Sequence, residues 1–385
     1  MTYDCDVIVI GAGINGVGVA QAAAAAGWSV RVLEQTGIAA GTSSRSSKLI
    51  HGGLRYLEIG NFGLVRESLH ERELLLRLAP ELVRRVAFHI PIYTSTVRSA
   101  LTVRLGLSLY ALLAGLGRDA RFAQLAPSQW DALDGLDTSA LRAVFRYHDA
   151  QTDDAALTRA VMRSAQQLGA ELVCPARFIG ARRHSMGIEV DYLGAGGAAT
   201  LRARVLINAA GPWANLTLAA IAPKLRALPV DLVQGTHIVV PGHLAHGAYY
   251  LEARDRRAVF VLPWRDAVLV GTTESVYSGD PAQVCALPQE IEYLRATLRR
   301  YFPSMADEPR AAFAGLRVLP RDRTLPFRRS RETVLHADDA RVLTIYGGKL
   351  TSYRLTAQRV LARLRALLPE RRTYADTARL PLSPD

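Results

Sequence analysis

The start of the chain alternates between short apolar runs and a glycine-rich turn. The apolar run CDVIVI at 5–10 precedes GAGING, the alanine-rich stretch VGVAQAAAAAG follows, and a second apolar run ends at Glu34. Short apolar runs bounded by glycine indicate buried strands, and a longer alanine-rich stretch indicates a helix. The pattern therefore predicts a strand, a glycine turn, a helix and a second strand, which is a βαβ opening.

Several later segments carry apolar residues at helical spacing. Most of them mix apolar and charged positions, which predicts amphipathic helices packed on a core. The segment 101–116 is apolar on most sides and predicts a buried helix, with a helix resting on a membrane surface as the alternative. The predicted helices span 61–85, 101–116, 153–169 and 287–301.

Short apolar runs predict two groups of strands. The runs at 171–179, 187–193 and 200–207 follow a predicted helix and return to the first domain. Between 230 and 273 the chain is strand-rich, which suits a second, mostly antiparallel sheet. A last strand at 342–346 leads through a turn into a helix. We expect an α/β fold in which a Rossmann-like domain carries a second, mostly antiparallel β domain.

Charge narrows the classes of partner. The 385 residues carry a formal net charge of +12 at pH 7. This charge favours anionic substrates or lipid surfaces, but the basic residues are scattered without interleaved aromatic side chains, so we expect no nucleic acid partner. Of the 47 basic residues only Lys48, Lys224 and Lys349 are lysines. A lysine in so arginine-rich a chain indicates a place for a compact ammonium group.

Cysteines and apolar runs exclude further classes. Cys5, Cys174 and Cys285 are far apart and follow no metal-ligand spacing, so we expect neither a disulfide framework nor a metal site. No run of eighteen or more apolar residues occurs, and the first predicted strand begins too early to leave room for a signal peptide. We expect a cytoplasmic protein, with peripheral contact at the inner face of the cell membrane left open.

The glycine turn has the form of a dinucleotide-binding fingerprint. Gly11, Gly13 and Gly16 form GxGxxG between a predicted strand and a predicted helix, and Glu34 ends the next strand. The glycines let the backbone approach a pyrophosphate at the helix N-terminus, and the carboxylate accepts hydrogen bonds from a ribose. Glu34 argues against NADP, because it would repel a 2′-phosphate. The segment GTSSRSSKLIHGGLRY at 41–56 offers many donors along an extended cofactor, and this favours FAD over NAD.

Segments along nearly the whole chain resemble the FAD-dependent glycerol-3-phosphate dehydrogenases of the D-amino-acid-oxidase-like flavoprotein superfamily. They are GAGING, TSSRSSKLIHGGLRYLE, NAAGPWA, GTHIVVP, GTT at 271–273 and YGGKLTSYR. GxGxxG and AAGPW are general to the superfamily, whereas SSKLIHGGLRYLE and GGKLTSYR are specific to the narrower family. The resemblance runs from Asp6 to about Leu368.

The resemblance implies an enzyme that moves a hydride from the secondary carbinol carbon of sn-glycerol 3-phosphate to flavin N5 and forms dihydroxyacetone phosphate. It also implies non-covalent FAD and an electron acceptor that is a quinone or, in the oxidase branch, oxygen. A dianionic phosphate calls for convergent cationic and hydroxyl groups. We expect Arg55, Tyr56 and Arg331 to bind the substrate, and Arg317 and Lys349 to serve as catalytic residues.

The roles of three residues, Lys349, His51 and His237, each have an alternative. Lys349 follows two glycines at a helix start, where it can face the flavin pyrimidine oxygen and favour the anionic reduced flavin; a solvated lysine is the alternative. His51 and His237 are the candidates for the base that takes the hydroxyl proton. The sequence does not decide between them, and a structural core histidine is the alternative for either.

The resemblance also assigns a cofactor set and a domain division. The FAD-binding domain is expected at 1–90, 145–225 and 330–370, the substrate-binding domain at 91–144 and 226–329, and a C-terminal tail at 371–385. The residues expected to bind FAD are Gly11, Gly13, Ile14, Asn15, Gly16, Glu34, Gln35, Thr42, Ser43, Ser44, Ser46, Ser47, Lys48, Leu49, Ala210, Gly211, Gly348, Lys349, Leu350 and Thr351.

The chain departs from the family pattern in two places. It stops at Asp385, before the helical C-terminal domain that longer members carry, so we expect a short form. The sequence GLRVL at 315–319 stands where the family has GVRPL, and an arginine-rich loop follows at 321–331. A bulkier or more acidic substrate than glycerol 3-phosphate would suit this change.

Two other classes of function fit parts of the sequence. A related oxidase or dehydrogenase of a small hydroxy acid or amino acid would use the same arginines to hold a carboxylate. A flavin-containing binding module without turnover would dock through the positive charge. A panel of substrates separates these classes, because only an enzyme has its flavin bleached by a donor.

Overall fold

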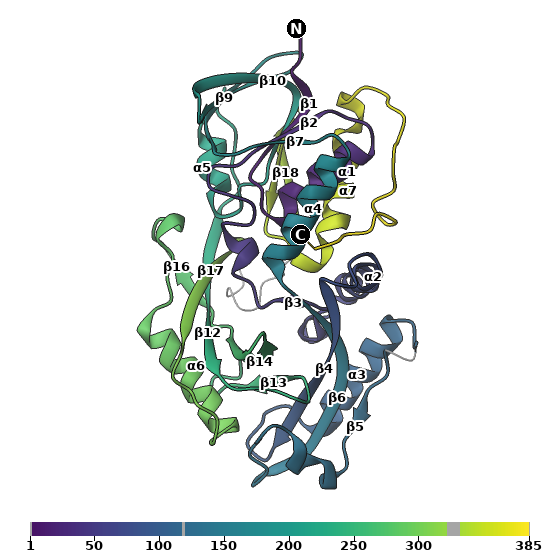
Figure 1. Ribbon diagram of the computed structural model, residues 1–385, viewed down its shortest axis with the longest axis vertical. Helices are drawn as coiled ribbons and strands as arrows, with labels where there is room; N and C mark the ends of the chain where they lie inside the picture. Colours follow the sequence, from purple (N-terminus) through teal and green to yellow (C-terminus); the bar gives the residue numbers. More distant parts are fainter. Residues whose placement is uncertain (1, 118–119, 322–331, 385) are drawn as a thin grey trace.

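The computed structural model describes residues 2–117, 120–321 and 332–384, and it consists of two β-sheets with helices packed on them (Figure 1). The first sheet and helices α1, α4 and α7 occupy the upper half of the view, and the second sheet fans out below them. The expected α/β fold with a second, mostly antiparallel β domain is confirmed.

The first sheet is built around the predicted βαβ opening. Strand β1 (Cys5–Ile10) lies between β10 (Gly197–Asn208) and β2 (Val30–Leu33) and is parallel to both. The βαβ connection explains why β1 and β2 are parallel. The crossover helix returns the chain to the end of the sheet at which β1 began, so β2 runs in the same direction. The other strands of the sheet are β7 (Glu171–Val173), β8 (Ala176–Arg183), β9 (Ile188–Gly194), β11 (Ile221–Ala222), β18 (Val334–Asp339) and β19 (Val342–Tyr346).

Three helices cover one face of the first sheet. Helices α1 (Ile14–Ala25), α4 (Asp154–Gln167) and α7 (Tyr353–Leu364) pack together over β1 and β10 in one hydrophobic cluster. The alanines of α1 allow this close approach, because a small side chain leaves room for the neighbouring helices. The predicted helix at 153–169 and the predicted strand at 342–346 are confirmed.

The second sheet is mostly antiparallel. Its central strand β12 (Val230–Pro241) pairs with β15 (Ala267–Gly271) and with β17 (Ala311–Pro320). Helix α6 (Pro288–Tyr301) packs on this part of the sheet through Leu294 and Leu298. The other strands are β3 (Leu49–Ile50), β4 (Val83–Tyr93), β5 (Ala123–Gln124), β6 (Leu141–Thr152), β13 (Ala248–Glu252), β14 (Ala258–Trp264) and β16 (Ser275–Tyr277).

Two of the predicted domain limits fall inside the long strands β4 and β6 of the second sheet. They pair with each other along almost their whole length, so the expected limits at 90/91 and 144/145 fall within them. The C-terminal segment packs on the first domain, since the Tyr374 amide donates to the Ala25 carbonyl and the Leu382 amide donates to the Leu78 carbonyl.

Two helices differ from their predictions. Helix α2 (Phe62–Leu78) ends well before residue 85, because Pro80 follows and the chain turns into β4. Helix α3 (Ala100–Leu113) was expected to be buried, and this was wrong. Val103, Leu107 and Tyr110 are buried on one side, but Leu101 and Leu105 are 66% and 62% exposed. A run of apolar residues on every side does not reveal which side the protein core covers.

Short helices complete the described chain. They are α5 (Ala214–Ala219) and the 3-10 helices η1 (Thr42–Ser44), η2 (Leu54–Leu57), η4 (Pro127–Ala132), η5 (Gly211–Trp213), η6 (Pro281–Gln283), η8 (Leu350–Ser352) and η9 (Arg365–Leu367). Several of these, η1, η2, η5 and η8, contribute to the cavity between the two sheets.

Candidate active site

A cavity of about 980 Å³ runs between the two sheets. Its walls come from the turn after β1, from the segment 40–56, and from β12 and β17 of the second sheet. A volume near the upper end of the range for ligand sites suits a large cofactor together with a small substrate. Segments far apart in the sequence therefore meet in one site.

The glycine turn opens the N-terminus of α1 to the cavity. Gly13 is the residue before the helix and has no side chain to cap it. The Ile14 amide donates to the Ser43 hydroxyl, which leaves the amides of Asn15 and Gly16 to face a pyrophosphate. Gly11 has a φ of +98°, and a Cβ there would lie 2.8 Å from the carbonyl oxygen of Ala209. A Cβ on Gly16 would lie 1.9 Å from the Gly11 oxygen, so this position admits no side chain.

Glu34 lies directly beside this glycine turn. Its Oε2 accepts a hydrogen bond of 2.8 Å from the Ala12 amide, and its Oε1 accepts one of 2.8 Å from the Thr36 amide. The carboxylate lines the cavity and holds the first and second strand ends together. It is therefore placed where a ribose hydroxyl would meet an acceptor.

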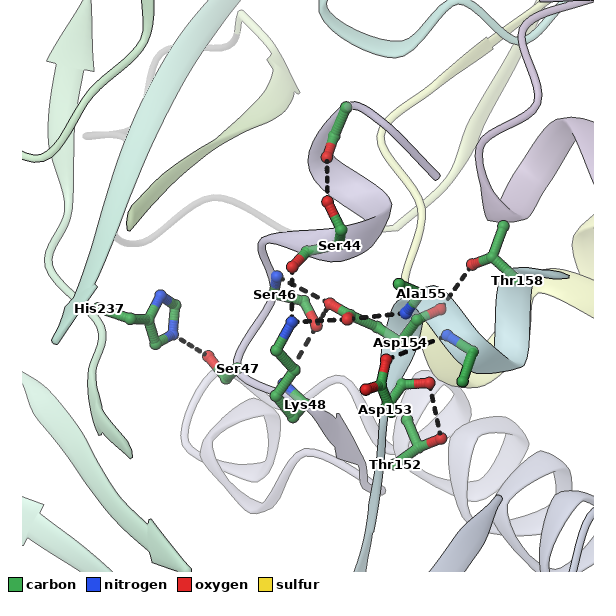
Figure 2. Close-up of polar contacts among 12 residues, drawn as sticks. Ser44, Ser46, Ser47, Lys48, Thr152, Asp153, Asp154, Ala155, Thr158 and His237 are labelled. Carbon is green, nitrogen blue, oxygen red and sulfur yellow. Dashed lines mark hydrogen bonds and ion pairs between the residues drawn. The ribbon is translucent and has the colours of Figure 1, made fainter. Parts of the chain in front are cut away.

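The hydroxyl-rich segment that begins with η1 crosses from the first domain to the second. The Ser43 hydroxyl accepts a hydrogen bond from the Ile14 amide at 2.9 Å, and the Thr42 hydroxyl donates to the Leu316 carbonyl at 2.8 Å. Ser46 and Ser47 line the cavity, whereas Lys48 turns its ammonium away to Asp154 at 2.6 Å (Figure 2). Of the residues expected to bind FAD, only Gly16, Ser44 and Lys48 do not line the cavity.

The turn before α7 closes the same cavity from the C-terminal side. Gly347 and Gly348 have φ values of +69° and +106°, which favour glycine. The Asn15 side chain donates from Nδ2 to the Gly347 carbonyl at 3.1 Å, so the turn is fixed to the start of α1. The Lys349 ammonium lies 3.7 Å from the centre of the Tyr56 ring. Lys349, Leu350 and Thr351 all line the cavity, as expected from the sequence.

Arg317 on β17 brings a partly buried positive charge to the substrate side. One guanidinium nitrogen donates to the Thr272 hydroxyl at 3.3 Å, and Nη1 is buried without a hydrogen-bond partner among the described residues. Burial lowers the pKa of Arg317 to about 10, with a further contribution from Arg55. The group stays charged at neutral pH, because this value remains well above 7.

Arg55 and Glu274 lie next to each other in the cavity wall. The Arg55 Nη1 lies 3.8 Å from the Glu274 Oε1, and the Glu274 side chain is 8% exposed. A carboxylate beside the arginine partly offsets its charge. Glu274 directly follows the GTT segment, but sequence reasoning missed it because a single acidic residue after a strand carries no pattern of its own.

The two candidate histidines lie in different surroundings. His237 on β12 stacks on Phe313 and lies 2.9 Å from the Ser47 hydroxyl. Burial, followed by the charges of Arg317 and Lys48, lowers the pKa of His237 to about 3, so the ring is neutral at pH 7 and is a weaker base than an ordinary histidine. The His51 amide donates to the Thr351 hydroxyl at 3.1 Å. Both histidines line the cavity, and the structure leaves the choice between them a prediction.

The cavity also has walls that the sequence did not reveal. Tyr250 and Phe260 form an aromatic wall with their rings in edge contact, and Gly235 lies beneath the Arg317 guanidinium. No motif marks Tyr250 and Phe260, which lie on the ordinary strands β13 and β14, whereas Gly235 begins the GTHIVVP segment. The predicted substrate residue Arg331 lies outside the described residues.

Two further observations bear on ligands and membranes. Within residues 2–117, 120–321 and 332–384, no group of three or more histidine, cysteine or acidic side chains could hold a metal ion. Over the same residues, no helix is long and apolar enough to cross a bilayer.

Comparison with known proteins identifies the family. Residues 6–360 match the family described as DAO, FAD dependent oxidoreductase. A D-erythritol 1-phosphate dehydrogenase from Brucella abortus is 37% identical over 380 residues, which cover 95% of this chain and 74% of that protein. A glycerol-3-phosphate dehydrogenase from Pseudomonas aeruginosa is 38% identical over 375 residues, which cover 93% and 71%.

A solved structure agrees with these relatives. The glycerol-3-phosphate dehydrogenase from Bacillus halodurans, complexed with FAD, has a TM-score of 0.78 and 26% identity, over 98% of this chain and 67% of that one. The glycine turn at the start of α1 and the donor-rich segment 42–51 fit the same cofactor. The chain belongs to the FAD dependent oxidoreductase family and uses FAD as its cofactor.

Proposed function

We propose that the chain oxidises sn-glycerol 3-phosphate, or a polyol phosphate of the same type, to the corresponding ketone. For glycerol 3-phosphate the product is dihydroxyacetone phosphate, and the electrons pass on to a quinone. The observation that carries the proposal is the Arg317 guanidinium, whose buried Nη1 lacks a hydrogen-bond partner among the described residues. A buried cation of this kind calls for an anion with several acceptor oxygens, and a phosphate ester provides one.

The surrounding residues support a division of roles. Arg317, Arg55 and Lys349 converge on one end of the cavity and would hold the phosphate. When bound, FAD supplies at N5 the acceptor for the hydride of the carbinol carbon. His51 or His237 would accept the proton of the hydroxyl. The His237 ring is held by Ser47 and Phe313, but its lowered pKa makes it a weak base.

The length of the polyol chain stays open within this proposal. The relative from Brucella abortus is named for D-erythritol 1-phosphate, and the relative from Pseudomonas aeruginosa is named for glycerol 3-phosphate, at almost the same identity. The Glu274 carboxylate in the site could accept hydrogen bonds from the extra hydroxyl of a four-carbon substrate. We therefore include both phosphate esters in the test.

The test follows the flavin itself. Anaerobic bleaching of the purified yellow protein is measured with glycerol 3-phosphate, D-erythritol 1-phosphate, lactate and glycine, before and after Arg317→Ala. We expect bleaching by a phosphate ester and a loss of about 100-fold or more in the second-order rate with the variant, because a buried charge pair is broken. Arg321→Ala is the control, since Arg321 on the same stretch of chain is exposed and pairs with Asp231. Bleaching by lactate or glycine alone, or an unchanged rate with Arg317→Ala, would overturn the proposal.

We also propose that α3 rests on an anionic lipid surface and so brings the enzyme to a membrane quinone. Leu101, Leu105 and Leu112 are each more than half exposed and lie on one side of the helix, opposite the buried Val103 and Leu107. Exposed leucines on a protein of net charge +12 fit a membrane carrying anionic headgroups.

Sedimentation with vesicles tests this contact. We expect the holoenzyme to sediment with vesicles of phosphatidylglycerol, and replacement of Leu101, Leu105 and Leu112 by Ser to abolish this. Val276→Ser is the control, because Val276 is 68% exposed but lies on β16. Equal sedimentation of the triple variant and the parent would refute the contact, and bleaching by substrate should be unchanged in all three proteins.

A further inference from the structure

A buried ion pair holds the hydroxyl-rich segment of the cofactor site: Lys48 lies outside the cavity lining, and Asp154 belongs to it. The Lys48 ammonium lies 2.6 Å from the Asp154 Oδ1, and the two side chains are 6% and 0% exposed. The ammonium also donates to the Ser44 carbonyl. Figure 2 shows the pair between the segment 44–48 and the start of α4. The segment is thus tied to the helix layer of the first domain.

Asp154 is hydrogen-bonded at both carboxylate oxygens. Its Oδ2 accepts from the Ser46 amide at 3.0 Å and from the Ser46 hydroxyl at 2.6 Å. Its Oδ1 accepts from the Ala155 amide at 2.9 Å as well as from Lys48. Charge-assisted hydrogen bonds of this number fix a group more firmly than neutral ones. One carboxylate therefore determines where Ser46 lies in the cavity wall.

Lys48 has an unusual backbone conformation for a residue with a side chain. Its φ is +60°, in the region that favours glycine, and this costs free energy for any other residue. Its ammonium lies 5.4 Å from the ring centre of Trp264 and 5.3 Å from that of Phe313 in the second domain. A strained backbone is kept where the surrounding contacts over-determine it. For Lys48, the contacts of its side chain with Asp154 in the first domain and with Trp264 and Phe313 in the second keep this conformation.

The same segment reaches the substrate side through the next residue. The Ser47 hydroxyl lies 2.9 Å from the His237 Nε2, and the His237 ring stacks on Phe313 at 5.1 Å between centres. Ser46 and Ser47 both line the cavity, so a shift of this segment would move the cofactor wall and the histidine contact together.

We propose that Lys48 and Asp154 are positioning residues that hold Ser46 against the cofactor and Ser47 against His237. Neither side chain acts on the substrate. Both fix the position of the segment that carries Ser46 and Ser47. The inference rests on the proposed function only where turnover with a phosphate ester is measured. The affinity for FAD tests it without any substrate.

Three variants of the pair separate positioning from stability. Asp154→Asn and Lys48→Met each leave one buried group without its partner, whereas the double variant leaves no unpaired charge. For each protein we measure the dissociation constant of FAD, the visible flavin spectrum, the thermal unfolding midpoint and bleaching by glycerol 3-phosphate. We expect both single variants to weaken FAD binding by about tenfold or more and to lower the midpoint. The double variant should regain the midpoint but keep the weakened FAD binding and a shifted spectrum.

Asp6→Asn is the matched control. The Asp6 Oδ2 accepts from the Ser29 amide and hydroxyl, each at 3.1 Å, and its Oδ1 accepts from the Arg204 Nε at 3.0 Å. It is a buried carboxylate with the same kinds of donors, but it does not line the cavity. We expect this variant to lower the unfolding midpoint and to leave the FAD dissociation constant within about twofold of the parent.

Two results would overturn the inference. One is FAD binding and bleaching that recover fully, together with stability, in the double variant, because the pair would then act only through stability. The other is unchanged FAD binding and spectrum in the single variants. Should these not fold, Ser46→Ala removes only the hydroxyl bonded to Asp154, and an unchanged FAD dissociation constant and spectrum would be equally decisive. If glycerol 3-phosphate fails to bleach the parent protein, the proposed function fails while the FAD measurements still decide this inference.

Discussion

Replacing Glu290 by Gln should lower the stability of the substrate domain. Glu290 belongs to α6 and is 4% exposed. Its Oε2 accepts from the Gln234 amide at 2.6 Å and the Thr236 hydroxyl at 2.5 Å, and its Oε1 accepts from the Thr273 and Ser275 hydroxyls. Gln offers one acceptor oxygen, and its amide hydrogens would oppose a donor at the second position.

The size of the effect follows from these contacts. The hydroxyls can rotate to accept from the new amide, so the loss amounts to one or two hydrogen bonds to a charged acceptor. Each such bond contributes about 1.5–3 kcal/mol, so one or two of them give a loss of about 1.5–6 kcal/mol in the free energy of unfolding at pH 7. Thr236 precedes His237 on β12, so turnover should fall as well.

The acid dependence gives a second signature. Although burial opposes it, the hydrogen bonds from Thr236, Ser275, Thr273 and Gln234 lower the pKa of Glu290 in the folded protein. The stabilisation is therefore present above the pKa of an unfolded glutamate and is lost as the pH falls through the lower folded pKa. The difference between parent and variant should shrink on acidification.

Urea unfolding of the holoenzyme, at pH 7 and at lower pH, measures both effects. Glu292→Gln on the same helix is the control, because Glu292 is 55% exposed and bonds Arg299 at the surface. Equal stabilities of the two variants at pH 7, or a difference that grows on acidification, would refute the reasoning.

Two further predictions concern the cofactor and the histidine. Gly16→Ala should abolish FAD binding, because its Cβ would lie 1.9 Å from the Gly11 oxygen; a normal flavin spectrum would contradict this, and Gly63→Ala, with open space around it, is the control. The second-order rate of flavin bleaching should show no acid limb near the ordinary pKa of histidine, because burial first, then Arg317 and Lys48, lower the pKa of His237 to about 3. An acid limb between pH 6 and 7 that disappears in His237→Asn would count against that environment.

Local sequence patterns predicted the parts of the fold that depend on local chemistry. The strand, glycine turn and helix at the start form as expected because the close approach of backbones admits only glycine at Gly11 and Gly16. The strand-rich stretch from 230 onward forms the antiparallel sheet because it consists of short apolar runs, such as AVFVLPW and AVLVG, that are bounded by turns. Helix α3 was predicted wrongly as buried, since its solvent-facing side carries leucines as well.

The candidate site was predictable where motifs carry it and hidden where tertiary contacts build it. Arg317, Lys349 and His237 lie in segments with a family pattern, and all line the cavity. Glu274 has no such pattern, and its proximity to Arg55 arises only when the second sheet folds. The side chain of Lys48 was expected on the cofactor, but the direction of a side chain at a positive φ depends on Asp154, more than a hundred residues later.

The contact of Asn15 with Gly347 has a consequence for synthesis of the protein. The two ends of the cofactor site are joined by a hydrogen bond across 332 positions of sequence. A chain leaving the ribosome exposes the glycine turn early, but the opposing turn and Lys349 emerge only after all strands of the second sheet. The second sheet is therefore synthesised while the first domain still lacks its last strand and α7. FAD, which stabilises only the folded state, should then be loaded after α7 has formed, and chains that stop before α7 should not retain it.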